Sequence, residues 1–318
     1  MHDVKRILVT GGAGFIGSHI VDRLAAEGYE IIILDDLSTG KINNVSALLK
    51  NKLVKFIKGD IRDPEIVKNS IKKCDAVIHL AAITSVTRSL REPFIVNDVN
   101  VNGTLNLLKN SLDSNVKKFI FVSSTAVYGD NLPPLAEVML PRPLSPYGAS
   151  KLAGEHYCLS FWKSFELPTV ILRCFNVYGR RMSNNGYAPV ISKFTKNIRN
   201  NASITIYGDG EQTRDFIHVH DVVEAALLTL RSQEVSGDTI NIGTGKPTSI
   251  NQLVKLLIDL AGKEVRIIRK EARTGEIRHS HANITKATGK LGFLPKVDLK
   301  EGLQDTISAY IGVESLVH

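Results

Sequence analysis

The stretch RILVTGGAGFIGSH, residues 6–19, decides how the sequence is expected to fold. It joins a short apolar run, Arg6–Thr10, to an amphipathic run, Phe15–Glu27, through a glycine-rich turn. This order is typical of the first strand–turn–helix unit of a dinucleotide-binding fold, where glycines let the backbone approach a pyrophosphate. The N-terminus of the helix adds free N–H groups and the positive end of its dipole. The residues expected at the pyrophosphate are Gly11, Gly14, Phe15, Ile16 and Gly17.

The rest of the first half repeats this alternation of apolar runs and amphipathic stretches. The expected strands are Arg6–Thr10, Glu30–Leu34, Leu53–Lys58, Ala76–Leu80, Phe119–Val122 and Thr169–Arg173. The expected helices are Phe15–Glu27, Pro64–Ile71, Val101–Leu112 and Ser150–Phe165. Near-continuous apolar strands separated by helices predict a parallel sheet covered on both faces. The predicted fold class is therefore α/β, a doubly wound parallel (Rossmann) sheet in a nucleotide-binding domain of residues 1–175.

The second half, residues 176–318, has a different texture, with Gly, Asn and Arg frequent near its start. Its expected strands are Ser203–Tyr207, Thr239–Ile242 and Val265–Ile268, and its expected helices are Pro189–Arg199, Val219–Leu230, Ile250–Leu260 and Leu299–Ile311. We interpret it as a smaller, mixed α/β substrate-binding region, with some chain crossing back. No linker rich in Pro, Gly or Ser separates the halves, so the ligand cleft is expected between them.

Composition sets limits on the class of protein. The chain has 318 residues, 43% hydrophobic and 23% charged, with neither an apolar run of membrane-spanning length nor the apolar core of a signal peptide near its start. We therefore expect a cytoplasmic protein with no membrane partner. The net charge of +8 is spread along the chain rather than gathered in a nucleic-acid-binding tail. Three scattered cysteines, Cys74, Cys158 and Cys174, suit core thiols and predict neither disulfides nor a metal site.

An acidic residue follows the second expected strand. Asp35 and Asp36 lie about 20 residues beyond the glycines, where a carboxylate accepts hydrogen bonds from the adenosine ribose and repels a 2′-phosphate. We therefore expect NAD rather than NADP. Asp35 is favoured because it directly follows the strand, and Asp36 is the alternative.

Two more strand ends are expected along the cofactor. Asp60 and Ile61 follow the third strand and are candidates for the adenine edge. Leu80, Ala81 and Ala82 follow the fourth, where small side chains allow the dinucleotide to lie close.

The candidate catalytic residues are Ser124, Tyr147 and Lys151. Tyr147 and Lys151 are spaced i and i+4 on an expected helix and share a face. A nearby ammonium and a positively charged nicotinamide both favour a phenolate, so the pKa of Tyr147 is expected to fall toward neutrality. The phenolate would then take a proton from a hydroxyl group while a hydride leaves the same carbon. Ser124 ends the fifth strand and would hydrogen-bond the reacting oxygen, whereas Ser123 is expected to be a structural turn residue.

These motifs together resemble the extended short-chain dehydrogenases/reductases, and in particular the UDP-sugar 4-epimerases. The resemblance covers essentially the whole chain. Its marks in the first half are TGGAGFIGSH at 10–19, HLAA at 79–82, NVNGT at 100–104, SSTAVYG at 123–129 and YGASK at 147–151. Those in the second half are RCFNVYG at 173–179, GDGEQTRDFIHVHD at 208–221, NIGTGK at 241–246 and RTGEIRHSHA at 273–282.

The resemblance implies roles for individual residues. It implies that Ser124, Tyr147 and Lys151 form the catalytic triad and that NAD stays bound through a redox-neutral cycle at C4 of a UDP-sugar. The residues it places at ligands are Asn100 beside the cofactor, Ser85 and Asn176 on the UDP-sugar, and Arg214 and Arg273 on its diphosphate. It also suggests a homodimer joined through the helices near 101–112 and 150–165.

One position implies which sugar is used. In the family, the residue matching Ser280 acts as a size gate, and forms that accept N-acetylated sugars are similar to this chain in having a small residue there. Two other differences from glucose-type enzymes point the same way: Thr84-Ser85-Val86 follows HLAA, and Arg180-Arg181 follows NVYG. We therefore expect epimerisation of UDP-GlcNAc and UDP-GalNAc, with UDP-Glc and UDP-Gal also possible substrates.

Enzymes with other activities resemble this scaffold too. Sugar-nucleotide 4,6-dehydratases resemble one another in an Asp-Glu pair where this chain has Thr125 and Ala126, and the decarboxylases similarly look to a Glu in that segment. A UDP-glucuronate 4-epimerase stays open, because Arg180 or Arg181 could meet a sugar carboxylate. A non-catalytic dinucleotide sensor is disfavoured because such proteins typically lose the Tyr/Lys pair. Nucleic-acid binding is disfavoured because the chain lacks a basic aromatic platform.

Overall fold

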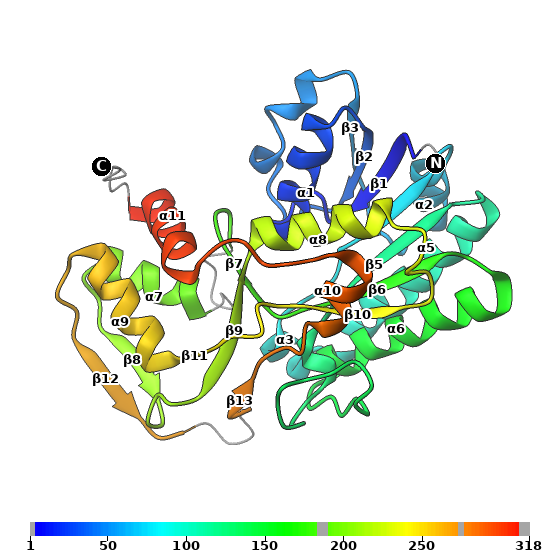
Figure 1. The fold of residues 1–318 in the computed structure, drawn as a ribbon. Helices are drawn as coiled ribbons and strands as arrows, with labels where there is room; N and C mark the ends of the chain where they lie inside the picture. The colour runs from blue at the N-terminus through cyan, green and yellow to red at the C-terminus, as the bar shows by residue number, and fades with distance from the viewer. Residues whose placement is uncertain (1–3, 183–189, 273–276, 312–318) are drawn as a thin grey trace.

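The computed structural model describes residues 4–182, 190–272 and 277–311 (Figure 1). Its centre is a parallel sheet of seven strands in the order β10-β6-β5-β4-β1-β2-β3. These strands are β1 (Arg6–Thr10), β2 (Glu30–Asp35), β3 (Val54–Lys58), β4 (Ala76–His79), β5 (Lys118–Ser124), β6 (Thr169–Cys174) and β10 (Thr239–Ile242). The predicted doubly wound α/β fold is confirmed.

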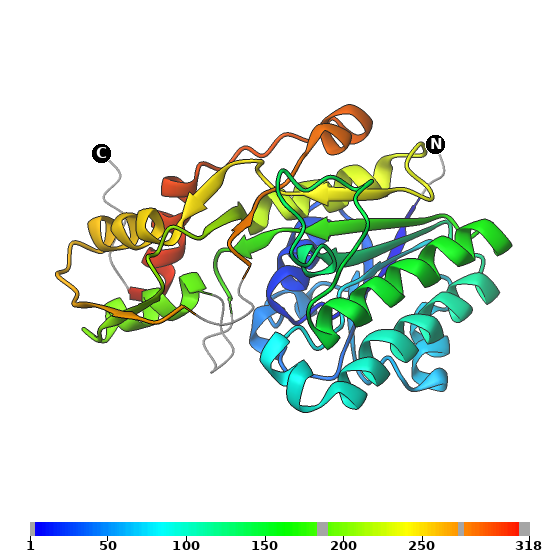
Figure 2. The same ribbon diagram turned by 90° about the horizontal axis from the view of Figure 1, so that it is seen from below.

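Helices cover both faces of this sheet (Figure 2). On one face lie α1 (Phe15–Ala26) and α8 (Val219–Arg231), and on the other lie α2 (Pro64–Ile71), α5 (Gly103–Asp113) and α6 (Pro146–Phe165). The burial of strand β1 on both faces explains the unbroken apolar run at its centre. Its Ile7 and Val9 pack with the first layer, while Leu8 between them packs with the second. A strand buried on both sides cannot alternate apolar with polar residues.

The smaller region is built from short sheets and three helices. One sheet joins β11 (Pro247–Ser249), β9 (Thr213–His218), β13 (His279–Ser280) and β7 (Asn176–Tyr178), and a second pairs β8 (Ile204–Tyr207) with β12 (Ile267–Lys270). The helices α7 (Val190–Arg199), α9 (Ile250–Ala261) and α11 (Leu299–Ile311) pack into their own apolar core. Within the described residues no helix has the length and apolar character needed to cross a membrane.

The structure differs from the sequence-based elements in several places. Helix α6 begins at Pro146 rather than Ser150, because Ser145 caps it by accepting a hydrogen bond from the backbone N–H of Gly148 at 3.1 Å. A π-helical turn, Asp98–Asn102, precedes α5, so that helix begins two residues later than expected. The elements that sequence patterns missed are β7, β9, β11, β13, α3 (Val86–Arg91), α4 (Pro93–Asn97) and α10 (Thr285–Leu291).

The packing of the glycine turn can be tested by replacing Gly17, which lies against it, with Gly289 in α10 as the control. A Cβ on Gly17 would lie 2.2 Å from the carbonyl oxygen of Gly11, a backbone atom that cannot turn aside. We expect Gly17→Ala to lower the free energy of unfolding by roughly 1–3 kcal/mol, as overpacking does. Gly289 lies exposed in α10 with open space around it, so Gly289→Ala should raise stability by roughly 0.5–1 kcal/mol. Denaturant melts measure both, and equal effects would contradict this account.

Candidate active site

The first component of the site is the glycine turn at the carboxyl end of β1. Strand β1 lies between β2 and β4, and the chain leaves these strands toward opposite sides, which makes a crevice where such folds bind ligands. Gly11 adopts a φ of 68°, and a Cβ there would lie 2.8 Å from the backbone nitrogen of Ala81. The turn therefore needs glycine because the segment after β4, with Leu80, Ala81 and Ala82, passes directly against it.

The N-terminus of α1 is arranged to receive an anion. Its cap residue, Gly14, has no side chain to satisfy the first N–H groups of the helix, which begin at Phe15 and Ile16. Such a helix end binds a phosphate through its N–H groups and dipole. The arrangement fits the pyrophosphate of NAD.

Asp35, the last residue of β2, lies beside this turn. Its carboxylate accepts hydrogen bonds from the backbone N–H of Ala13 at 3.0 Å and of Leu37 at 2.8 Å. Burial raises the pKa of Asp35, and these two N–H donors oppose the rise. Asp36 is exposed and accepts instead from the N–H of Ser38. Of the two candidates, Asp35 is therefore the one held against the glycine turn, with lone pairs left for ribose hydroxyls.

The residues expected at the adenine edge have other partners. Asp60 forms an ion pair with Arg62, with 2.6 Å between Oδ2 and Nη2, and that hydrogen-bonded guanidinium lowers the pKa of Asp60. The side chain of Ile61 is buried in the core, and its carbonyl accepts a hydrogen bond from Asn106 at 2.8 Å. Ile61 thus has a packing role that sequence analysis did not foresee.

Asn100 links the segment after β4 to helix α6, which carries Tyr147 and Lys151. Its amide exchanges two hydrogen bonds with the backbone of Ile83, at 2.8 and 3.0 Å, and donates a third to Ser150 of α6 at 2.9 Å. It is 2% exposed, and its side chain fixes the segment after β4; its place beside the cofactor stays a prediction. Ser150 was not singled out from the sequence, because only the folded chain brings it to Asn100.

The three expected catalytic residues come together at the end of β5. Ser124 is the last residue of that strand, and its hydroxyl lies near enough to Tyr147 to lower the pKa of the phenol. Lys151 lies one turn further along α6, with Nζ 4.1 Å from the centre of the Phe121 ring. Tyr147 and Lys151 are both buried. The end of β5 and the first turns of α6 thus carry a serine hydroxyl, a phenol and an ammonium.

In the polypeptide alone, burial raises the pKa of Tyr147, and the neighbouring Ser124 opposes the rise without cancelling it. Burial also lowers the pKa of Lys151 to about 8, while the carboxylate of Glu155 acts in the opposite direction. The expected fall in the pKa of Tyr147 counts on the charge of a bound nicotinamide as well as on Lys151, so it stays a prediction.

The sequence predicted that Ser123 is a turn residue, and this prediction is wrong. It lies within β5, is buried, and donates its hydroxyl to Glu155 Oε1 at 2.5 Å. The partner is 32 residues away in the chain, so local sequence carries no sign of it.

The expected substrate residues are spread over both regions. Ser85 caps α3 by accepting from the N–H of Arg88 at 3.1 Å, and Asn176 of β7 donates to the carbonyl of Asp215 at 3.1 Å. Arg214 of β9 pairs in register with Ser280 of β13, and Ser280 is buried. Arg273 lies outside the described residues, so its role stays a prediction.

Asp215 is a residue that sequence analysis missed. Its buried carboxylate accepts four hydrogen bonds: from the N–H and hydroxyl of Thr244, from the N–H of Gly245 and from the N–H of Ala282. It thereby fastens β9, which carries Arg214, to the chain beside Ser280. A charged residue amid short apolar runs was its only sequence signal.

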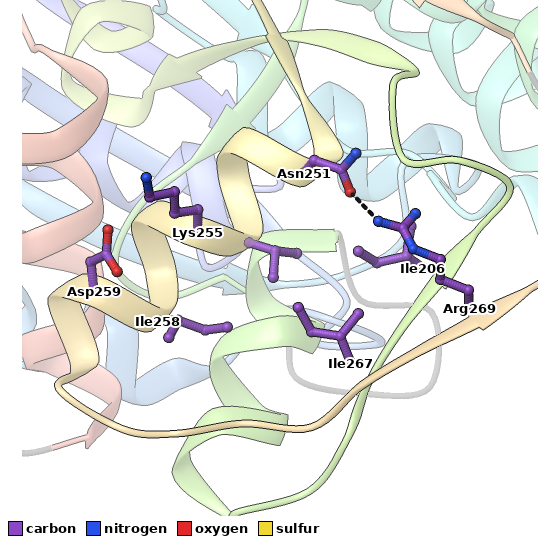
Figure 3. A pocket seen from close by; sticks show the side chains of 8 residues that line it. Ile206, Asn251, Lys255, Ile258, Asp259, Ile267 and Arg269 are labelled. Atoms are coloured by element: carbon purple, nitrogen blue, oxygen red, sulfur yellow. Dashed lines mark hydrogen bonds between the residues drawn. The ribbon is translucent and has the colours of Figure 1, made fainter.

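Figure 3 shows a pocket of about 330 Å³ elsewhere in the smaller region. The side chains that line it come from β8, α9 and β12, among them Lys255 and Arg269. None of the expected catalytic or cofactor residues belongs to it. No group of three or more metal-binding side chains occurs among residues 4–182, 190–272 and 277–311.

A doubly wound sheet with a glycine turn, an acidic residue at the end of β2 and a Ser–Tyr–Lys set whose Tyr and Lys are buried defines an NAD-dependent enzyme of the short-chain dehydrogenase/reductase class. Residues 7–243 match the NAD dependent epimerase/dehydratase family, and the chain belongs to that family.

Relatives within the family carry different activities. The chain is 41% identical to the UDP-glucose 4-epimerase of Thermotoga maritima, solved with UDP-glucose, with a TM-score of 0.91 over 98% of this chain and 100% of that one. It is 40% identical to the UDP-N-acetylglucosamine 4-epimerase of Methanobrevibacter ruminantium, solved with UDP-N-acetylmuramic acid, with a TM-score of 0.92 over 97% and 98%. It is also 37% identical to the human dTDP-D-glucose 4,6-dehydratase, over 96% of this chain and 90% of that one.

Replacing the phenol tests the assigned base. Tyr147→Phe keeps the ring but cannot accept a proton, so we expect turnover to fall by ~10²–10⁴-fold. Because the ring still fills its buried place, NAD content and melting temperature should stay close to those of the wild type. Kinetic assay with each candidate UDP-sugar measures the loss. Retention of more than half of the activity would remove Tyr147 from the mechanism.

Proposed function

We propose that this enzyme interconverts the C4 epimers of UDP-sugars through a 4-keto intermediate. The observation that carries the proposal is the placement of Ser124 near Tyr147, with Lys151 one helical turn away, at the same carboxyl edge of the parallel sheet as the glycine turn. Related dehydratases also hold NAD, so the activity has to be argued from the residues around this pair.

The chain's own residues carry the proton chemistry. Tyr147 takes the proton from the 4-hydroxyl and later returns it, while Ser124 hydrogen-bonds the reacting oxygen and Lys151 keeps a positive charge near the phenolate. NAD, held by the glycine turn and Asp35, supplies a reversible hydride acceptor and, through its nicotinamide, a positive charge that favours the phenolate. That charge matters because burial alone raises the pKa of Tyr147.

The competing reactions find less support. Elimination of the 6-hydroxyl needs an acid beside the catalytic serine, and Thr125 and Ala126 occupy that segment, with the N–H of Ala126 donating to Ser124 Oγ at 3.2 Å. The uronate alternative rested on Arg180 and Arg181. Arg180 pairs with Asp305 at 2.7 Å and Arg181 with Asp22 at 2.7 Å, so both guanidinium groups already have a carboxylate partner.

Ser280 supports N-acetylated sugars as substrates. It is a small residue, buried in β13 and paired with Arg214, one of the expected diphosphate ligands. A side chain as large as tyrosine at this place would take up room that a C2 acetamido group needs, and close-packed sites do not absorb such overlap without strain. The substrates proposed are therefore UDP-GlcNAc and UDP-GalNAc, with UDP-Glc and UDP-Gal as possible further ones.

The identity of the sugar can be tested at this one position. Purified enzyme should convert UDP-GlcNAc to its C4 epimer, followed by NMR of the products, with UDP-Glc and UDP-GlcA run in parallel. Ser280→Tyr should abolish turnover of the acetylated pair while sparing any activity on UDP-Glc. Ser280→Cys, which stays small, is the matched control and should behave as the wild type. A wild type that never epimerises UDP-GlcNAc, or a tyrosine variant that still does, would refute the gate.

We also propose a homodimer joined through α6 and the helices beside it. Large apolar side chains are exposed on α3, α4 and α6, which pack on one another: Leu90 is 64% exposed, Phe94 is 88% and Tyr157 is 39%. Such a patch on a water-soluble enzyme is typical of an interface. Helix α5 overlaps the 101–112 segment, which the sequence also suggested for the interface. None of its large apolar side chains is exposed.

The dimer is tested by placing a charge in this patch. Phe94→Asp should give a monomer in sedimentation experiments, because an ionised carboxylate resists burial between subunits. Leu132→Asp, at an equally exposed leucine (84%) in the loop after β5, is the control and should leave the dimer intact. A wild type that sediments as a monomer, or a Phe94→Asp dimer, would contradict the proposal.

A further inference from the structure

A buried ion pair lies one helical turn beyond Lys151. Glu155 of α6 is 2% exposed, and its carboxylate accepts from Arg173 of β6, with 2.6 Å from Nη2 to Oε2 and 3.0 Å from Nε to Oε1. Ser123 of β5 donates to Oε1 at 2.5 Å. One carboxylate therefore joins the strand that ends at Ser124, the helix that carries the catalytic pair, and the neighbouring strand.

Stability by itself gives a poor account of this pair. Taking two charges out of water is costly, and well-packed apolar residues often serve a core as well or better. The position of Glu155 is more telling. It is spaced i+4 from Lys151, so the two side chains share one face of α6. Lys151 is itself buried, with its ammonium against the Phe121 ring rather than in water.

The groups around the ammonium leave Glu155 as the source of negative charge. The titratable groups that act on Lys151 from its own helix and from the packed strands are Glu155, Cys158, Cys174 and His79, with Tyr147 one turn earlier. Burial raises the pKa of both thiols and of the phenol, and it lowers the pKa of the imidazole well below its ordinary value. These shifts favour the uncharged forms of the thiols, the phenol and the imidazole, which leaves the carboxylate of Glu155, paired with Arg173 at 2.6 Å, as the acidic group next to the ammonium.

We propose that Glu155 is a positioning residue that acts through Lys151. Its carboxylate, fixed by Ser123 and Arg173, supplies the negative charge that keeps the buried ammonium protonated and in place beside Tyr147. The same carboxylate holds the end of β5, which carries Ser124, against α6, which carries Tyr147. This inference rests on the proposed roles of Tyr147 and Lys151, and it adds a group that touches neither substrate nor cofactor.

The pH dependence of kcat separates this role from a structural one. In Glu155→Gln the ammonium loses its counter-charge, so the pKa of Lys151 should fall further and the alkaline limb of the profile should move to lower pH by about one unit or more. The ratio of variant to wild-type kcat should therefore decrease as pH rises. Glu155→Asp, which keeps the charge, should restore the position of the limb even where its kcat is lower.

Controls isolate the charge. Ser123→Ala loosens the carboxylate without removing it, so kcat should fall by a similar factor at every pH. Asp113→Asn removes a carboxylate from an i,i+4 pair with Lys109 that lies exposed on α5, and it should leave the profile unchanged. Should Glu155→Gln fail to fold, the double variant Glu155→Gln/Arg173→Gln also removes the guanidinium that the single variant leaves unpaired, and it should shift the limb in the same direction because Lys151 again lacks its carboxylate.

The possible outcomes decide between distinct ideas. A variant-to-wild-type ratio that stays constant with pH, in Glu155→Gln or in the double variant, would make Glu155 a merely structural residue and overturn the inference. A wild type that turns over no UDP-sugar would instead overturn the proposed function.

Discussion

The parallel pairing of β1 with both β2 and β4 is the constraint on which the rest of the molecule depends. Because these strands run the same way, their carboxyl ends meet at one edge of the sheet. That edge brings the glycine turn, Asp35 and the segment after β4 together from distant parts of the chain. The close approach of Gly11 to Ala81 is possible only because the registers of the three strands are fixed by the buried residues on both faces.

Buried carboxylates perform the corresponding task where regular strand pairing ends. Asp215 holds two backbone segments, Thr244-Gly245 and Ala282, against β9, and Glu155 joins two strands of the large sheet to α6. Both carboxylates are buried and fully hydrogen-bonded, which is how a protein accommodates an ionised group away from water. They act at the joints between elements, where apolar packing alone does not specify one arrangement.

Sequence patterns predicted the features that depend on local periodicity. The apolar run at Arg6–Thr10, the glycine spacing and the Tyr147–Lys151 pair all follow from short-range rules, and the fold class followed from their repetition. Strand β9 was missed because Arg214 and Asp215 interrupt its apolar pattern, although Asp215 points into the core. The hydrogen bonds of Ser123 and Asn100 span 32 and 50 residues, and no local rule contains them. The burial that raises the pKa of Tyr147 in the polypeptide alone is a property of the folded chain, and no local pattern shows it.

The late return of the chain to the large sheet limits how far the two regions can act separately. After β6 the chain builds much of the smaller region, then comes back as α8 against α1 and as β10 against β6. A fragment that stopped at residue 175 would leave β6 as an open sheet edge and would bare the apolar surface that α8 covers, two features that promote aggregation. Residues on either side of that point therefore fold together. The first half of the chain leaves the ribosome first, but it cannot finish folding until the second half, which supplies α8 and β10, has been synthesised.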